Sequence, residues 1–284
     1  VGTYQISVVP DDTANYEVVP FNAELVIKNA TQDVFAIEGV PEAVYYGDNF
    51  TVTADNAGGD VTYTVSGNAT VDQDGNVVVT GTGKVTITAT SQKTGYTDKT
   101  AVKTFTANKR VLTTEVTAVN KVYDGSKDVE VTVALDNVVN QDDVKATAKG
   151  AMADANAGTD KLVYVTEIAL TGDKADLYTI QSANAQTGVD IAQRTITAFT
   201  VSALDKKYDG SDHADVNITN IEGLLANDEG QVTIIGNAVF DDENSGENKV
   251  VTFTANVIGG SKGGNYKFAD DDVKTQTTNA NIEK

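Results

Sequence analysis

Apolar and polar side chains alternate with a period of two along most of this sequence, and helical spacing is rare. Val85, Ile87 and Ala89 alternate with threonines in residues 85–90, and residues 251–257 repeat this pattern. Because successive side chains of a β-strand point to opposite faces, each such segment predicts a strand with one buried and one polar, threonine-rich face. The alternation therefore predicts an all-β fold.

Turn-forming dipeptides separate the predicted strands at short intervals. Short strands with frequent turns are typical of β-sandwiches, so we expect tandem sandwich modules arranged as an elongated rod. Helical turns are expected only near residues 151–157 and 221–227. Asp-Gly occurs at 74–75, 124–125 and 209–210, and Gly-Gly at 58–59 and 259–260.

The composition excludes several classes of site. The 284 residues include no Cys, no Trp and one His (His213), so disulfides, thiolate metal ligands and cysteine nucleophiles are impossible. We expect no enzymatic activity and no cofactor. With 41 acidic and 21 basic residues, the formal charge is -20, which disfavours nucleic acid as a partner and favours a soluble monomer.

The chain is expected to be a fragment of a longer protein that does not insert into a membrane. No stretch approaches the ~18 consecutive apolar residues of a membrane-spanning helix. The sequence begins at Val1, inside a predicted strand and without an initiator Met. Targeting and anchoring signals would then lie outside these residues.

An internal repeat organises the second half of the chain. Residues 121–126 (KVYDGS) return as residues 206–211 (KKYDGS), and residues 156–161 (NAGTDK) return as residues 244–249 (NSGENK). The segment around Tyr178 returns around Tyr266. Three landmarks in the same order identify two copies of one module, at 108–193 and 194–284, with linkers near 108–111 and 193–195.

These landmarks resemble the YDG and MBG repeat modules of large bacterial surface and secreted proteins. The first copy departs from the pattern with Leu177 where the Asn before the closing Tyr is expected. Residues 1–30 loosely resemble the closing part of such a module, through Tyr4, Asn15-Tyr16 and residues 24–28. We interpret them as a C-terminal remnant of a further copy.

Residues 31–107 differ from these copies and resemble bacterial Ig-like modules. The resemblance rests on Val40-Pro41, on the segment 47–52 (GDNFTV), and on the three strand-like segments 61–67, 71–79 and 81–90, the last of which is GTGKVTITAT. It implies a small sandwich with a role in spacing or adhesion.

The repeated Tyr-Asp-Gly is interpreted as a structural motif. Tyr123 and Tyr208 are expected to be buried at strand ends. The following turns hold Asp124 with Gly125, and Asp209 with Gly210, where Gly supplies a positive φ and Asp bonds the local backbone. On this interpretation Tyr208→Ala would cost about 3–5 kcal/mol of stability. A repeated ligand contact is the alternative.

Three other tyrosines are candidate ligand contacts. Tyr45 and Tyr46 are adjacent on a predicted strand, so one of the two should be exposed, and Tyr96 lies beside Gly95 in a polar turn. We expect a glycan or a matrix protein as a possible partner.

Acidic clusters are weak candidates for calcium, and two lysines for a Lys–Asn isopeptide bond. Residues 72–76 imitate a calcium loop, but position 12 from Asp72 is Gly83, where an EF-hand needs Glu. Lys161 and Lys249 lie near Asn residues. The calcium candidates are Asp241, Asp242, Asp270, Asp271 and Asp272.

Together these observations predict a non-enzymatic structural or stalk segment of a bacterial cell-surface or secreted, adhesin-like protein, located outside the cell. The alternative is a direct adhesin or carbohydrate-binding segment that uses exposed Tyr and Thr faces. A cluster of exposed aromatic side chains would favour binding.

Overall fold

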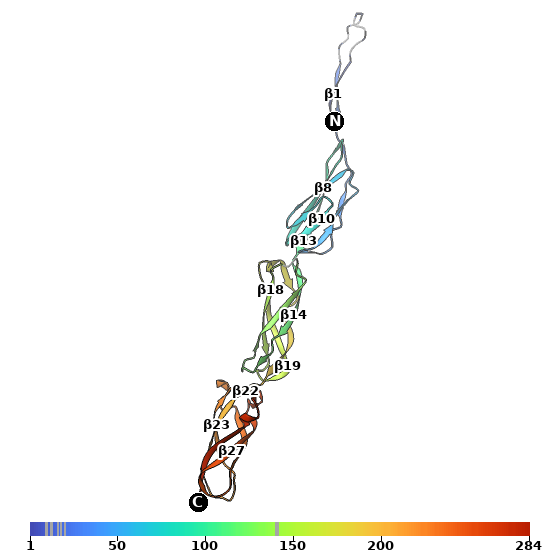
Figure 1. Ribbon diagram of the computed structural model, residues 1–284. Helices are drawn as coiled ribbons and strands as arrows, with labels where there is room; N and C mark the ends of the chain where they lie inside the picture. The colour runs from blue at the N-terminus through green and yellow to red at the C-terminus, as the bar shows by residue number, and fades with distance from the viewer. Residues whose placement is uncertain (9–10, 12–13, 16, 18, 20, 140–141) are drawn as a thin grey trace. The chain divides into compact units, whose positions relative to one another are not determined.

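The computed structural model describes residues 1–8, 11, 14, 15, 17, 19, 21–139 and 142–284. Most of the described residues lie in strands, and the helical elements among them are short 3-10 turns (Figure 1). The predicted all-β, sandwich-type fold class is confirmed.

The strands of the first 108 residues are β1 (Gly2–Ser7), β2 (Asn22–Ile27), β3 (Ala30–Thr31), β4 (Ala36–Glu38), β5 (Val44–Tyr45), β6 (Asn49–Thr51), β7 (Thr53–Asp55), β8 (Asp60–Ser66), β9 (Ala69–Val71), β10 (Asn76–Val79), β11 (Gly83–Gln92), β12 (Tyr96–Thr97) and β13 (Lys99–Asn108).

The remaining elements are β14 (Arg110–Ala118), β15 (Lys121–Val122), β16 (Asp128–Val129), β17 (Val131–Asp136), β18 (Lys145–Met152), β19 (Gly158–Thr171), η1 (Ala175–Leu177), β20 (Tyr178–Ile180), β21 (Ala185–Ala192), β22 (Arg194–Ile196), β23 (Ala198–Ala203), β24 (Lys206–Lys207), β25 (Val216–Glu222), η2 (Ala226–Asp228), β26 (Thr233–Phe240), β27 (Gly246–Gly259), η3 (Gly263–Asn265), β28 (Tyr266–Phe268), η4 (Asp272–Lys274) and β29 (Thr275–Glu283).

The chain divides into two compact units. Unit 1 consists of Val1–Leu112, Asn137–Val144 and Gly172–Thr179, and unit 2 of Thr113–Asp136, Lys145–Thr171 and Ile180–Lys284. The segments 137–144 and 172–179 fall inside the module expected at 108–193, yet they group with unit 1.

Unit 1 has a sandwich core between a four-stranded sheet, ordered β5-β13-β11-β8, and a three-stranded sheet, ordered β6-β10-β9. Val77 on β10 and Val85 and Ile87 on β11 belong to one buried cluster, so the two sheets pack their apolar faces together. The alternation predicted for residues 85–90 is confirmed, because Val85, Ile87 and Ala89 are fully buried.

Unit 2 shows the repeat as repeated topology. One antiparallel set is ordered β18-β19-β21 within a five-stranded sheet, and the other is ordered β26-β27-β29 within a four-stranded sheet. Both sets carry a register shift at the same place, between Gly158 and Lys161 in the first and between Gly246 and Lys249 in the second. The landmark at 156–161 and 244–249 therefore marks an irregularity common to the two copies.

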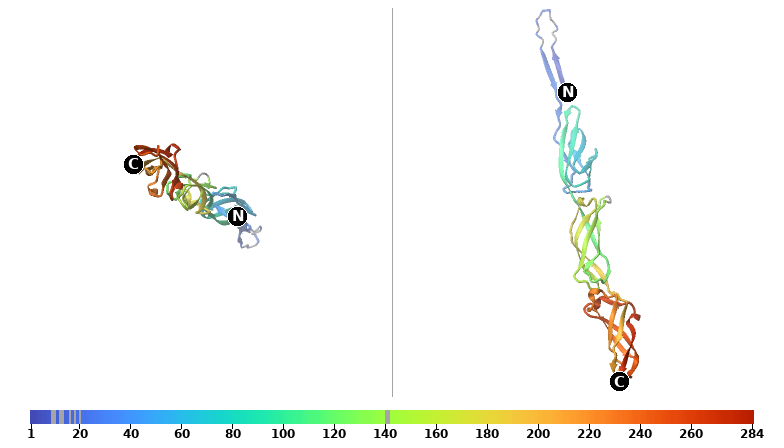
Figure 2. Two further views of the ribbon diagram at one scale, coloured as in Figure 1. Left: turned by 90° about the horizontal axis from the view of Figure 1, so that it is seen from below. Right: turned by 90° about the vertical axis from the view of Figure 1, so that its left-hand side faces the viewer.

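The first 30 residues, which are expected to be the remnant of a further module, contain an antiparallel pair of strands. Residues 2–7 pair with residues 22–27, and Figure 2 shows these two strands side by side at the blue end of the chain. Tyr16, part of the expected remnant of a module, lies outside the described residues. The helical turn expected near 221–227 is confirmed only at its end, where η2 begins at Ala226. The one expected at 151–157 is wrong, because β18 extends to Met152 and the residues from 153 to 157 form no helical turn.

No helix among the described residues is long and apolar enough to cross a membrane.

Candidate functional site

The Tyr-Asp-Gly turns have the local structure predicted from the sequence. In the first copy the Asp124 carboxylate accepts a hydrogen bond from the Ser126 backbone N–H at 2.9 Å, and Gly125 has φ 76°. Lys121 reaches across the turn and places its Nζ 2.8 Å from Asp124 Oδ1. A left-handed backbone favours glycine, which explains this residue at the third position.

The second copy repeats this turn. Asp209 accepts from the Ser211 backbone N–H at 2.9 Å, and Gly210 has φ 77°. The hydrogen bond from Lys206, followed by those from Ser211, lowers the pKa of the Asp209 carboxyl to about 2. The turn is therefore fixed by local contacts in both copies.

The Tyr123 ring lies in a buried cluster with an aspartate and a second tyrosine. The side chain is 0 % exposed, and its hydroxyl donates to Asp228 Oδ2 at 2.9 Å. Tyr266 donates to the same oxygen at 2.6 Å. The two rings meet edge to face, with centroids 5.6 Å apart. All three residues belong to unit 2, and they come from both copies of the repeat.

A second cluster of the same construction occurs within unit 1. Tyr46 donates to Asp142 Oδ2 at 2.8 Å, and Tyr178 donates to that oxygen at 2.5 Å. Their rings also meet edge to face, at 5.4 Å between centroids. These bonds explain why the segments holding Asp142 and Tyr178 group with residues 1–112.

The backbone positions the first tyrosine of each cluster in the same way. The N–H of Tyr46 donates to the carbonyl of Asn108 at 2.9 Å, and the N–H of Tyr123 donates to that of Ala192 at 2.9 Å. In both cases the two residues before the tyrosine pair in parallel with the last strand of the sheet. Tyr46 is thus the structural counterpart of Tyr123, although it lies outside the repeat.

The second tyrosine and the aspartate are also matched. The hydroxyl of Tyr178 accepts from the backbone N–H of Val139 at 3.0 Å, and that of Tyr266 accepts from Leu225 at 3.2 Å. Each phenol therefore accepts one hydrogen bond and donates another. The buried Asp228 and the half-buried Asp142 each accept two phenolic hydrogen bonds, and a carboxylate bonded in this way is a satisfied polar group.

The environment shifts the ionisation of the phenols upward. Burial, together with the hydrogen bond to Asp142, raises the pKa of Tyr46 and of Tyr178 to about 12. Burial and the bond to Asp228 raise the pKa of Tyr266 to about 12 and also raise that of Tyr123. The phenols remain hydrogen-bond donors over a wider pH range because a phenolate beside the carboxylate would be repelled.

Sequence reasoning missed Asp142 and Asp228. Alignment of the two copies would have provided a signal, since each aspartate follows a left-handed residue by five positions, Asn137 in one copy and Gly223 in the other. An Arg marks each arrangement too. Arg110 Nε donates to the Asn137 carbonyl at 3.1 Å, and Arg194 Nε donates to the Gly223 carbonyl at 2.7 Å.

The expectation of a buried Tyr208 is wrong. Its side chain is 54 % exposed, and no described residue bonds its hydroxyl. The turn that follows it is intact, so the local sequence forms the turn without burying the ring. Because the ring is exposed, Tyr208→Ala is no longer expected to lower the free energy of unfolding by several kcal/mol. That loss is now expected for the buried Tyr123.

The candidate ligand contacts have different environments. Tyr45 is 36 % exposed and Tyr46 is 7 % exposed, so the expectation that one of the adjacent pair faces outward is met by Tyr45. The burial of Tyr46 in its cluster removes it from the surface that a ligand would contact. Tyr96 is half-buried, with the Lys93 ammonium 4.6 Å from its ring centroid. A ligand role for Tyr45 and Tyr96 stays a prediction.

The acidic candidates for calcium are engaged with cations or with the backbone. Lys249 Nζ lies 3.1 Å from Asp241 and 2.6 Å from Asp242, and Lys274 Nζ lies 2.7 Å from Asp271. Asp270 accepts from the backbone N–H of Val273 at 3.0 Å. In the part of the chain that the structure describes, including Asp272, no group of three or more acidic or His side chains is arranged to hold a metal ion.

The lysines considered for an isopeptide bond face carboxylates. Lys161 Nζ lies 2.5 Å from Asp154 Oδ1 and also donates to the backbone carbonyl of Asn156 at 2.7 Å. The hydrogen bond to Asp242 raises the pKa of Lys249, which favours its ammonium form. Attack on an amide carbon needs the neutral amine, so this environment opposes the reaction.

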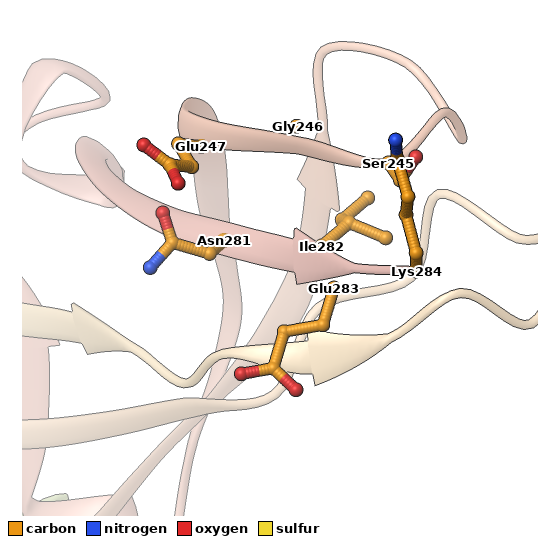
Figure 3. Close-up of a pocket in the computed structure, with 7 residues that line it drawn as sticks. All are labelled: Ser245, Gly246, Glu247, Asn281, Ile282, Glu283 and Lys284. Carbon is orange, nitrogen blue, oxygen red and sulfur yellow. The ribbon is translucent and has the colours of Figure 1, made fainter.

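A shallow pocket of about 330 Å³ lies at the end of unit 2, where Asn281, Ile282 and Glu283 on β29 face Gly246 and Glu247 on β27 (Figure 3). The corresponding place in the first copy is also hollow. It is lined by Asn120, Lys121, Val122, Gly158, Thr159, Asp190, Ile191 and Ala192. Because both pockets lie at the register shift, they belong to the construction of the repeat.

The single histidine is exposed and lies 3.6 Å from an Asp215 oxygen. Ser261 stands in a Gly-X-Ser-X-Gly sequence, residues 259–263, in the turn between β27 and the three-residue η3. A nucleophile elbow joins a strand to a helix, so this turn is not one.

Repeated antiparallel sandwiches with matched aromatic clusters define a protein of tandem β-sandwich repeats. The YDG domain family matches residues 107–186 and 192–278, more than half of the chain. The chain belongs to this family, and the two expected copies are confirmed.

Solved structures with some similarity include extracellular cadherin proteins. The protocadherin gammaB4 extracellular domain has a TM-score of 0.28 and 11 % identity, over 99 % of this chain and 55 % of that one. Protocadherin gamma B2 extracellular cadherin domains 3-6 have a TM-score of 0.27 and 11 % identity, over 88 % of this chain and 71 % of that one. The chain thus spans about half the length of the first of these. No curated protein sequence matches the chain.

Proposed function

We propose that this chain is a non-enzymatic structural segment of a bacterial cell-surface or secreted adhesin-like protein. In this proposal residues 31–107 are a bacterial Ig-like module, the two YDG copies follow it as a stalk, and the sandwiches succeed one another as a rod. Residues 1–30 would be the closing part of a further module of the YDG or MBG type.

One observation carries the proposal: two Tyr–Asp–Tyr clusters of the same construction hold their polar groups in contacts within the chain. Asp228 is 4 % exposed and accepts hydrogen bonds from two phenols, and Asp142 accepts two in unit 1. Carboxylates that are buried or half-buried and accept hydrogen bonds from two packed phenols stabilise and specify a fold, and the bonded oxygen is not available to a ligand. A structural role explains why the same residue types recur with the repeat.

A binding screen separates this role from direct adhesion. The purified chain is tested at fixed concentration against immobilised polysaccharides and extracellular-matrix proteins, with and without calcium, and its cooperative thermal unfolding is recorded in the same buffers. A structural segment shows no saturable binding while it unfolds cooperatively. Saturable binding that is lost in Tyr45→Ala, and retained in the matched surface variant Tyr164→Ala, would favour direct adhesion.

The proposed location needs its own test. Antibodies raised against the purified chain should label intact, unpermeabilised cells, or the culture medium, of the source bacterium. Labelling that appears only after the cells are permeabilised would contradict an extracellular location.

A further inference from the structure

The Tyr208 region has the backbone geometry of a tyrosine–aspartate–tyrosine cluster but lacks its acceptor. The N–H of Tyr208 donates to the carbonyl of Glu283 at 2.8 Å, as Tyr46 does to Asn108 and Tyr123 to Ala192. The two preceding residues, Lys206 and Lys207, pair in parallel with the last strand, β29. Tyr208 is therefore placed as the first tyrosine of a third cluster, the position that Tyr46 and Tyr123 occupy in the other two.

The difference lies in what surrounds the ring. Tyr46 is 7 % and Tyr123 0 % exposed, whereas Tyr208 is 54 % exposed. The glycines near these rings show the same contrast. A Cβ on Gly47 would meet Val139 at 2.4 Å and one on Gly125 would meet Leu225 at 3.6 Å, but a Cβ on Gly210 would meet nothing within 4 Å. Val139 and Leu225 precede the acceptor aspartates, so the missing neighbour at Tyr208 is an acceptor loop.

We propose that Tyr208 is a docking point for a further YDG module that follows β29 in the same chain and supplies a free Asp–Tyr pair. The two occupied clusters suggest that the acceptor comes from the module that follows in the chain. The strand whose carbonyl bonds Tyr46 leads into the segment that carries Asp142, and the strand that bonds Tyr123 leads into the segment that carries Asp228. The inference rests on family membership and geometry, and is independent of the proposed location.

A second copy of this chain is a poorer occupant. The two acceptor aspartates that the described residues contain, Asp142 and Asp228, each already accept hydrogen bonds from two phenols. To accept Tyr208, a second copy would have to release Tyr46 or Tyr123 from a buried site. A module with an unoccupied pair has no such cost.

The occupied clusters also specify what the docked module should contain. An Arg stands two residues after the carbonyl that bonds the donor tyrosine, as Arg110 does after Asn108 and Arg194 after Ala192. A left-handed residue whose carbonyl accepts from that Arg should follow, with the acceptor aspartate five residues later. A tyrosine after a short 3-10 turn should complete the pair.

The test extends the full chain by a duplicate of residues 194–284 placed directly after Lys284. The duplicate carries Val216→Ile, so that its Tyr-Asp-Gly peptide differs in mass from the original. Both proteins are treated with tetranitromethane, and the nitration rate of each tyrosine is followed by peptide mass spectrometry. In the unextended chain we expect rapid nitration of Tyr208 and slow nitration of Tyr123.

In the extended chain the nitration rate of the original Tyr208 should fall at least about tenfold, since the reaction then requires the docking site to open. The tyrosine at position 208 of the duplicate should stay reactive. Asp228→Ala in the duplicate, which removes the acceptor, should restore rapid nitration of the original Tyr208, and circular dichroism reports whether that duplicate is folded. A Tyr266→Phe duplicate, which keeps the aspartate, should retain most of the protection.

Three results would overturn the proposal. The first is an original Tyr208 that stays fully reactive in an extended chain whose duplicate unfolds cooperatively. The second is protection that persists with Asp228→Ala in a folded duplicate, because the aspartate would then have no part in docking. The third is protection of Tyr208 in the unextended chain that rises with protein concentration, which would assign the site to a second copy.

Discussion

Tyr123 and Tyr208 occupy the same position in two copies of one repeat, yet Tyr123 is 0 % and Tyr208 54 % exposed. Both are held by a backbone hydrogen bond to the last strand of their sheet, and both precede a turn with the same internal bonds. Their burial is therefore determined by the segments they meet. For Tyr123 these segments carry Asp228 and Tyr266.

The first prediction compares these two tyrosines. Tyr123→Ala should lower the free energy of unfolding of unit 2 by about 3–5 kcal/mol, because it removes a buried aromatic ring and leaves a cavity. Tyr208→Ala should change it by only about 0.5 kcal/mol, as is usual for exposed side chains. Urea unfolding followed by far-UV circular dichroism measures both. Equal losses in the two variants would contradict the assigned burial.

The second prediction concerns the shared carboxylate. Asp228→Ala removes the acceptor of two phenolic hydrogen bonds in a buried site, and a bond to a charged group contributes about 1.5–3 kcal/mol. We expect a loss of about 3 kcal/mol or more in urea unfolding. Asp215→Ala, at a carboxylate with a side chain 82 % exposed, is the matched control and should have little effect. A neutral result for Asp228→Ala would mean that the cluster does not stabilise unit 2.

Much of the fold could be predicted from the sequence because it depends on local patterns. Alternation identified the strand that buries Val85, and it predicted that one of the adjacent Tyr45 and Tyr46 would be exposed, which is Tyr45. The Tyr-Asp-Gly turns were also predictable, since Asp124 bonds the backbone only two residues away. These features require no knowledge of distant segments.

The clusters depend on contacts between residues far apart in the chain. Tyr123 meets an acceptor 105 residues later, and Tyr46 one 96 residues later. The sequence around Tyr208 is nearly the same as that around Tyr123, so no local pattern distinguishes the exposed ring from the buried one. Tyr46 is followed by Gly-Asp instead of Asp-Gly, which hid its equivalence to the repeat.

The third prediction is a loss of stability at alkaline pH. Burial and the bonds to Asp142 and Asp228 raise the pKa values of Tyr46, Tyr178 and Tyr266 from 10.0 to about 12. Between these values the unfolded chain has released phenolic protons that the folded chain retains, so stability falls as the pH rises. The contribution of these three phenols to the free energy of unfolding should be fully present below pH ~10 and should be lost as the pH rises through ~12. Absorbance at 295 nm should show tyrosines that ionise late in the folded chain and at the ordinary pH in guanidinium chloride. Coincident titrations would exclude the raised pKa values.

The fourth prediction compares the glycines that lie near Tyr46 and Tyr208. Gly47 and Gly210 both have a positive φ, 82° and 77°, so Ala at either site is strained by about 1–2 kcal/mol. Only at Gly47 would the added Cβ also meet a packed side chain, Val139 Cγ2 at 2.4 Å. Overpacking of this kind costs about 1–3 kcal/mol, so Gly47→Ala should destabilise the chain more than Gly210→Ala does. Combining Gly47→Ala with Val139→Ala should recover the difference, because the smaller side chain makes room for the Cβ. Urea unfolding of the three variants measures these effects. If Gly47→Ala and Gly210→Ala destabilise equally, the close approach of Val139 to Gly47 is not present in solution.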